Sequence, residues 1–137
     1  MKLTTIIHGI GLALSAALLT SVAADKGGKI PPASDKKGVT YTADIKPILD
    51  KSCIGCHGKD KQKGKLRLDT YEAAAKGGEN GKIYTAGKSA DSTIVKAVAR
   101  VVEDDAMPPA DNKDKIPPLT KEQVGLIRAW IDQGAKK

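Results

Sequence analysis

The sequence predicts an all-α fold of about four helices. Apolar residues recur at helical spacing in separate stretches of the chain, and residues able to cap a helix precede these stretches. Glycines or proline-containing loops follow several of them. No buried strand of a βαβ pattern is found, which argues against a mixed α/β fold.

The first helix is expected to have Thr42 or Asp44 as its cap and to carry apolar residues on one face. These are Ile45, Ile48 and Leu49. Pro47 is then the third helical residue if Asp44 is the cap, a position where the missing N–H has no acceptor within the helix. A proline is therefore compatible with this helix.

A short second helix is expected from Tyr71 to Lys76. Asp69 or Thr70 can cap it, and Gly77 and Gly78 stop it. Leu66 and Leu68 precede it in a short extended piece.

A third helix is expected from a cap at Ser89 or Asp91 through about Val102. Its apolar face is made of Ile94, Val98, Val101 and Val102.

The last helix is predicted to begin with a capping box and to end at Gly134. Thr120 and Gln123 have the spacing of such a box. Trp130, the sole tryptophan, is expected to pack against the first helix rather than to take part in chemistry.

Residues 1–24 are expected to be a secretory signal peptide. Lys2 supplies the positive start, residues 6–19 are apolar, and Ser21 to Ala24 form a small-residue cleavage site. An uncleaved anchor is the alternative, although the apolar stretch is short for a membrane span.

Residues 25–40 are expected to be a flexible linker rich in Lys, Gly and Pro, because they contain too little apolar surface to offset the entropy lost on ordering. The folded domain is then 41–137. It contains no phenylalanine, and the aromatic share of the chain is only 3%, so something besides side chains is expected to fill its centre.

The chemistry is concentrated in residues 53–57, Cys-Ile-Gly-Cys-His. They hold both cysteines and the only histidine that remains once the leader is removed. Cys-x-x-Cys-His is the attachment pattern of c-type haem. Cys53 and Cys56 lie on one side of a helical turn and can each bond a vinyl group of one porphyrin, and His57 can reach the iron. We therefore expect one covalently bound haem c.

Three other interpretations of the motif agree less well with the sequence. A structural zinc site needs four ligands, and the mature chain offers three. A thioredoxin-like dithiol should follow a buried strand. A disulfide between cysteines three residues apart would close too small a loop to stabilise a domain much.

Met107 is the expected second ligand of the iron, since it is the only thioether left after loss of Met1. Pro108 and Pro109 follow it and stiffen the backbone around the sulfur. Ordinary core packing is the usual role of a methionine. Ligation by a lysine or an open iron position are the alternatives.

These motifs together resemble a monohaem class I cytochrome c, and more narrowly the planctomycete-type cytochrome c domain. The resemblance covers about Tyr41 to Ala135. It rests on residues 44–49, 53–58, 66–69, 107–109 and 130–135. It implies an all-α fold in which the first and last helices cross, His57 as proximal ligand, a downstream methionine as distal ligand, and electron transfer as the role.

The expected function is that of a periplasmic one-electron carrier between redox proteins, and not of an enzyme. The alternatives are an open-iron haem enzyme or sensor, and a fixed electron-transfer subunit of a larger oxidoreductase. The formal net charge of +7 favours partners with an acidic docking surface. Nucleic acid is not expected, because few aromatics are available to stack on bases. We also expect a monomer with no stable membrane insertion after signal cleavage.

A lysine-rich stretch around the motif is a candidate docking surface. Its members are Lys51, Lys59, Lys61, Lys63 and Lys65. They can steer an acidic partner toward the haem edge, or they can form an ordinary solvated loop. For Arg67, a contact with a haem propionate is a further hypothesis.

Overall fold

The computed structural model describes residues 28–137, so the predicted signal peptide lies outside the described residues. Five α-helices and two short helices of other types follow one another. They are η1 (Tyr41–Ile45, a π-helix), α1 (Lys46–Ser52), α2 (Ile54–His57), η2 (Lys63–Lys65, a 3-10 helix), α3 (Tyr71–Lys76), α4 (Thr93–Val98) and α5 (Lys121–Asp132). The described chain contains no β-strand, only two isolated bridges. The helical class is as predicted, but the count of about four helices is not, mainly because the expected first helix is divided.

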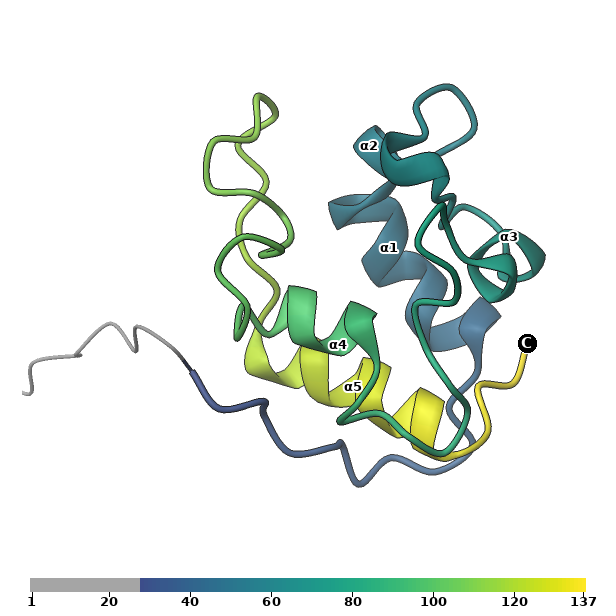
Figure 1. Cartoon of the computed structure of the whole chain (residues 1–137). Helices are drawn as coiled ribbons and strands as arrows, with labels where there is room; N and C mark the ends of the chain where they lie inside the picture. The colour runs from purple at the N-terminus through teal and green to yellow at the C-terminus, as the bar shows by residue number, and fades with distance from the viewer. Residues whose placement is uncertain (1–27) are drawn as a thin grey trace, which may run out of the picture.

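The domain has a helical base and two sides, one made of helices and one of a long loop (Figure 1). α4 and α5 pack on each other at the base. α1, α2 and α3 stand on one side, and the loop of residues 99–118 stands on the other. The two sides thus face each other above the base.

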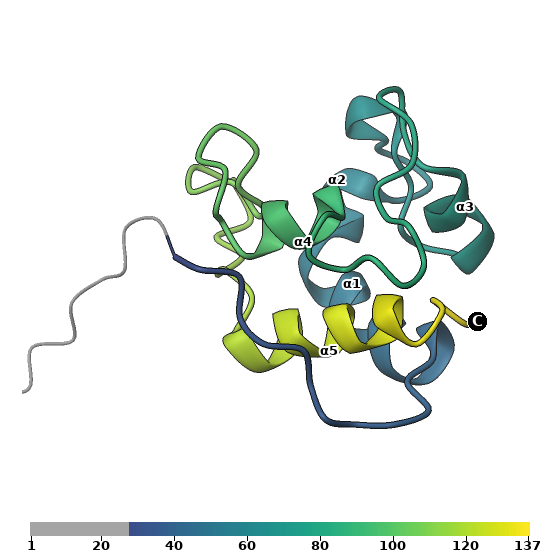
Figure 2. The same ribbon diagram turned by 60° about the horizontal axis from the view of Figure 1, so that its bottom comes forward.

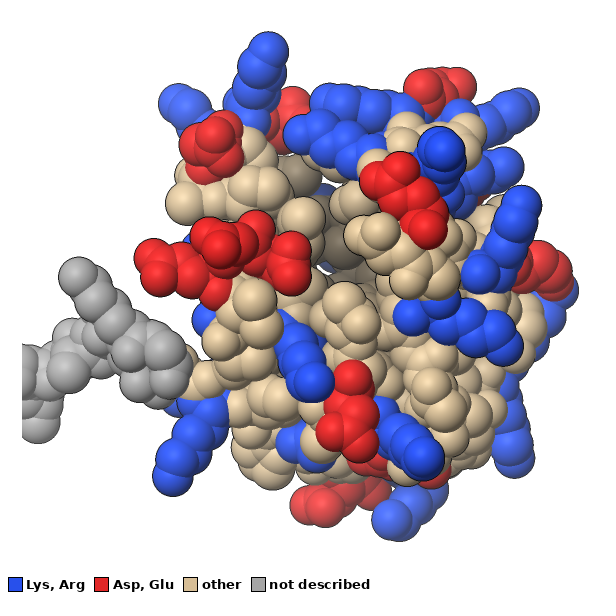
Figure 3. All heavy atoms as spheres, viewed as in Figure 1, with Lys and Arg blue, Asp and Glu red and all other residues tan. Residues whose placement is uncertain are grey.

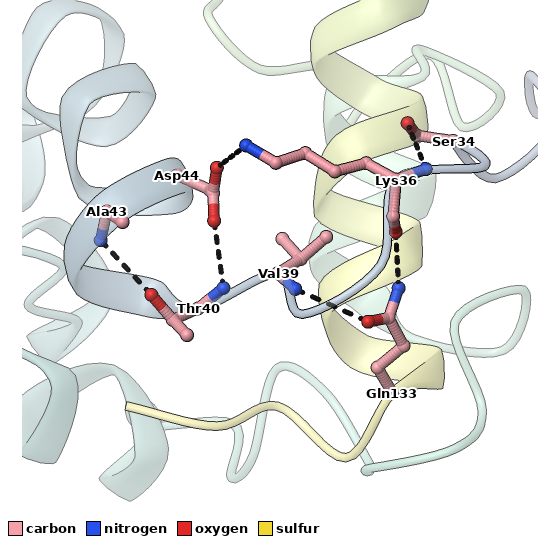
Figure 4. A network of polar contacts seen from close by, with 7 residues as sticks. All are labelled: Ser34, Lys36, Val39, Thr40, Ala43, Asp44 and Gln133. Atoms are coloured by element: carbon pink, nitrogen blue, oxygen red, sulfur yellow. Dashed lines mark hydrogen bonds and ion pairs between the residues drawn. The ribbon is translucent and has the colours of Figure 1, made fainter.

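The first helix begins earlier than Thr42 or Asp44. Thr40 is the cap, because its hydroxyl accepts a hydrogen bond from the Ala43 N–H at 3.3 Å. Asp44 has a different role, since its carboxylate accepts from the Thr40 N–H at 3.0 Å and pairs with Lys36 (Figure 4). One π-helical turn precedes α1, and Pro47 lies in the first turn of α1.

α5 begins with both bonds of the predicted capping box. The Gln123 N–H donates to the Thr120 hydroxyl at 3.2 Å, and the Thr120 N–H donates to the Gln123 side chain at 2.9 Å. Gly134 follows the helix with a left-handed φ of 98°, which glycine adopts without a steric penalty. The predicted end of this helix is therefore confirmed to within two residues.

Trp130 is buried and packs against the first helical segment, as predicted. Its ring centroid lies 6.0 Å from that of Tyr41 in η1 and 4.8 Å from that of Tyr84. Tyr71 meets Tyr41 at 5.7 Å, so all four aromatic side chains of the sequence form one connected cluster. This cluster secures the contact between α5 and η1.

α3 has the predicted bounds and the Thr70 cap, but α4 is shorter than predicted at both ends. Ser92 is its N-cap rather than Ser89 or Asp91. It ends at Val98 because Arg100 adopts a left-handed φ of 57°, which helical winding cannot continue. Val102 is consequently 39% exposed instead of lying on a helix face.

Residues 28–40 run along α5 (Figure 2), so the expected flexible linker does not describe this part of the chain. The Ser34 N–H donates to the Gly125 carbonyl at 2.9 Å, and Arg128 donates to the Pro31 carbonyl. A Cβ on Gly125 would lie only 2.8 Å from the Pro32 carbonyl oxygen. The missing side chain of Gly125 therefore lets this segment approach α5 closely, and main-chain bonds offset its low apolar content.

Tyr41→Phe should lower the free energy of unfolding by about 1–3 kcal/mol, because it leaves the Leu68 carbonyl without its donor. The Tyr41 hydroxyl donates to that carbonyl at 2.7 Å in a buried position. The Tyr71 hydroxyl bonds no residue within 28–137, so Tyr71→Phe is the matched control. Equal denaturant midpoints for the two variants would contradict this account.

Candidate haem-binding site

The Cys-x-x-Cys-His segment forms a single helical turn after a break at Cys53. Cys53 has φ −127° and ψ −37°, and α2 starts at the next residue. The N–H groups of Cys56 and His57 both donate to the Cys53 carbonyl, at 3.1 and 2.9 Å. Positions three apart on a helical turn lie on one side of it, so the turn can present both thiols to one ligand.

The imidazole of His57 is half-buried, and its Nδ1 has no hydrogen-bond partner among the described residues although the atom is buried. Burial lowers the pKa of His57, and the backbone carbonyls of Leu66 and Lys63 partly oppose this shift. The neutral form that binds a metal is thereby favoured. An unpartnered buried nitrogen beside two cysteines fits a site that holds a haem.

The two cysteines are free thiols. Burial, followed by the influence of Cys56, raises the pKa of Cys53 to about 11. A nucleophilic dithiol needs a lowered thiol pKa, so this environment does not suit a thioredoxin-like site. Within residues 28–137 no three His, Cys, Asp or Glu side chains gather to hold a metal ion, so the zinc interpretation gains no support.

Two hydrogen bonds connect the motif to η1 and thereby to the contact between η1 and α5. The Leu68 N–H donates to the His57 carbonyl at 2.7 Å, and the Leu68 carbonyl in turn accepts from the buried Tyr41 hydroxyl at 2.7 Å. The extended piece predicted around Leu66 and Leu68 is therefore the link between α2 and η1. Arg67 in this piece forms a two-bond ion pair with Asp69, at 3.0 and 2.7 Å, and lowers the pKa of that carboxyl.

Met107 lies on the other side, in the loop of residues 99–118. It is half-buried, and its N–H donates to the Ala97 carbonyl at 3.0 Å. Figure 3 shows a hollow in the surface, and in the same view Figure 1 shows this loop on one side of it and α1 and α2 on the other. The loop of residues 99–118 comes close to α2 at Asp114: a Cβ added to Gly55 would lie 3.5 Å from Asp114 Oδ2.

Two side chains that the sequence did not single out organise the loop. Arg100 donates through Nη1 to the Pro108 carbonyl at 2.7 Å. Asn112 donates to the carbonyls of Pro109 and Ile116 and accepts from the Ile116 N–H, at 2.7, 2.9 and 2.7 Å. An asparagine among prolines is a turn signal, whereas nothing local marks Arg100.

The balance of exposed charges differs between the two sides of the hollow. The five lysines of the candidate docking surface, Lys51, Lys59, Lys61, Lys63 and Lys65, are all exposed. On the facing loop, residues 103–105 are an exposed acidic run. Figure 3 shows basic side chains gathered above α2 and both acidic and basic ones over the facing loop.

A strandless helical domain that presents Cys-x-x-Cys-His beside a hollow is consistent with a c-type cytochrome. Residues 53–111 match the family model described as Planctomycete cytochrome C, which confirms the resemblance indicated by the sequence. A cytochrome c domain implies haem c and haem-based electron transfer, and such domains are typically exported. No curated protein and no solved structure shows significant similarity to the chain. None of the helices in the described part of the chain has the length and apolar character needed to cross a membrane.

Two glycines near the motif should differ sharply in their tolerance of alanine. A Cβ on Gly58 would lie 2.5 Å from the Ile54 carbonyl oxygen, whereas one on Gly55 meets only Asp114 at an ordinary distance. Gly58→Ala should cost about 1–3 kcal/mol of stability and lower the yield of haem-loaded protein. Gly55→Ala should be neutral or stabilise by up to about 1 kcal/mol, since Gly55 is helical and exposed. Comparing the haem content and denaturant midpoints of the two variants tests the geometry of this turn, and an equal loss in both would contradict it.

Proposed function

We propose that the protein is a one-electron carrier whose single haem c is bonded to Cys53 and Cys56 and whose iron is ligated by His57 and Met107. The buried, unpartnered Nδ1 of His57 beside two cysteines that form no disulfide is the observation that carries this proposal. When bound, the haem supplies an Fe(III)/Fe(II) couple that exchanges one electron.

The protein residues have three tasks in this proposal. Cys53 and Cys56 hold the porphyrin against α2. His57, kept neutral by burial, provides the strong ligand, and Met107 provides the weak one. Thioether ligation favours the less charged reduced state, so a raised reduction potential is expected.

We further propose that the protein is exported to the periplasm and acts there as a monomer. The predicted signal peptide supports export. The exposed lysines beside α2 support an acidic redox protein as partner, since charge complementarity steers association. No substrate pocket is needed for this role.

The ligation is tested by the visible spectra of the purified protein and of Met107→Ala. The ferric protein should show the weak red-edge band of sulfur bound to iron, and Met107→Ala should lose it while keeping the haem bound. The reduction potential of the variant should fall, because the thioether no longer stabilises Fe(II). A ferric spectrum typical of an open iron position in the unmodified protein would favour the sensor or enzyme alternative instead.

Electrostatic steering is tested with ferricyanide, a small anionic oxidant, as the probe. Its bimolecular rate with the reduced protein should fall as ionic strength rises, since salt screens the lysine charges. Lys59→Glu with Lys63→Glu should slow the reaction at least about threefold at low salt. Lys121→Glu with Lys137→Glu makes the same charge change at α5 and the C-terminus, and is the control. An equal effect of both pairs, measured by stopped flow, would rule out local steering by these lysines.

A further inference from the structure

We infer that Arg100 is a positioning residue that holds the Met107 segment in the place from which its sulfur can ligate the iron. The inference rests on the proposed ligation by Met107. In this role Arg100 does not contact the haem but fixes the backbone next to Met107.

The backbone at Arg100 turns the chain out of α4. Its φ of 57° lies in the left-handed region, which non-glycine residues seldom occupy. Two hydrogen bonds stabilise this turn, one from the Arg100 N–H to the Ala97 carbonyl at 3.1 Å and one from the Val101 N–H to the Lys96 carbonyl at 3.2 Å. Such a conformation in a loop beside a candidate ligand suggests a functional constraint on the turn.

The same turn brings Met107 back to the end of α4. The Met107 N–H donates to the Ala97 carbonyl at 3.0 Å, so the carbonyl that receives the Arg100 N–H also anchors the ligand segment. The chain from Arg100 to Met107, which includes the exposed acidic run, therefore forms a loop whose two ends both bond the Ala97 carbonyl. The backbone on the N-terminal side of Met107 is thereby fixed.

The side chain of Arg100 fixes the C-terminal side. Its guanidinium donates to the carbonyl of Pro108, the residue after Met107, at 2.7 Å. Arg100 forms no ion pair with any residue in 28–137, so its half-buried charge is directed at this carbonyl. Hydrogen bonds from a charged donor are roughly twice as strong as neutral ones. Met107 is therefore held between two anchors, the Ala97 carbonyl in the last turn of α4 and the Arg100 side chain just after that helix.

Asn112 stabilises the rest of the loop by a separate set of bonds within residues 109–116. These bonds do not reach Met107 or α4. Within the described residues, Arg100 is thus the only side chain whose hydrogen bond ties the segment next to Met107 to the turn that follows α4. Loss of that bond should let the weak thioether ligand leave more readily while the helices stay folded.

The test is displacement of the methionine by added imidazole in the ferric, haem-loaded protein. Arg100→Gln should bind imidazole about tenfold more tightly, because the intact sulfur ligation competes less well when its anchor is lost. Arg100→Lys, which keeps one charged donor, should recover part of the difference. Arg128→Gln is the control, since Arg128 also donates to a proline carbonyl, that of Pro31, and to the Ser89 hydroxyl, both far along the chain from Met107. Its imidazole affinity should stay within about twofold of the unmodified protein.

The outcomes separate the two proposals. If the unmodified protein lacks the sulfur-to-iron band, the ligation by Met107 is wrong and this inference falls with it. If the band is present and Arg100→Gln binds imidazole no more tightly than Arg128→Gln, the ligation stands and the positioning role of Arg100 is overturned. The denaturant midpoints of Arg100→Gln and Arg128→Gln show whether general destabilisation accounts for a change in imidazole affinity. If the imidazole affinity rises in proportion to the loss of stability in both variants, the positioning role of Arg100 is also overturned.

Discussion

The hydrogen bond from the Tyr41 hydroxyl to the Leu68 carbonyl joins the helix crossing to the candidate site. Tyr41 belongs to the aromatic cluster with Trp130, and Leu68 is bonded to the His57 carbonyl. The position of the imidazole thus depends on how η1 meets α5, although these elements lie at opposite ends of the domain sequence. The sequence has few aromatic residues, and all of them pack where η1 meets α5. This contact stabilises the side of the domain that carries the Cys-x-x-Cys-His motif.

The opposite side of the hollow is built on a different principle. Residues 99–118 contain no helix or strand, and their conformation depends on the left-handed turn at Arg100 and on the side-chain bonds of Arg100 and Asn112. The weak ligand would then come from an irregular segment and the strong ligand from a helical turn. Such a division suits an iron whose charge must change while its ligands stay in place.

Local signals predicted some of these features and not others. The capping box at Thr120 and the cap at Thr70 depend on residues close in sequence, and the structure agrees with both. The attachment motif is equally local, and the structure places it in a single helical turn. The end of α4 is not predicted by the sequence, because no glycine or proline marks the left-handed turn at Arg100, which backbone bonds to Ala97 and Lys96 stabilise. Residues 28–40 are predicted to be flexible because their apolar content is low, yet hydrogen bonds such as Ser34 to Gly125 and Arg128 to Pro31 hold them against α5. The absence of a side chain at Gly125 permits this close approach. The family match extends over the attachment motif and Met107 but tests no individual ligand.

The central claim is that a haem is covalently bonded to the α2 turn. It is tested most directly by the intact mass of the purified, exported protein under denaturing conditions, which remove any haem held only by ligation. The account predicts the mass of the polypeptide plus one haem. A mass equal to that of the polypeptide alone, with both cysteines open to alkylation, would contradict it.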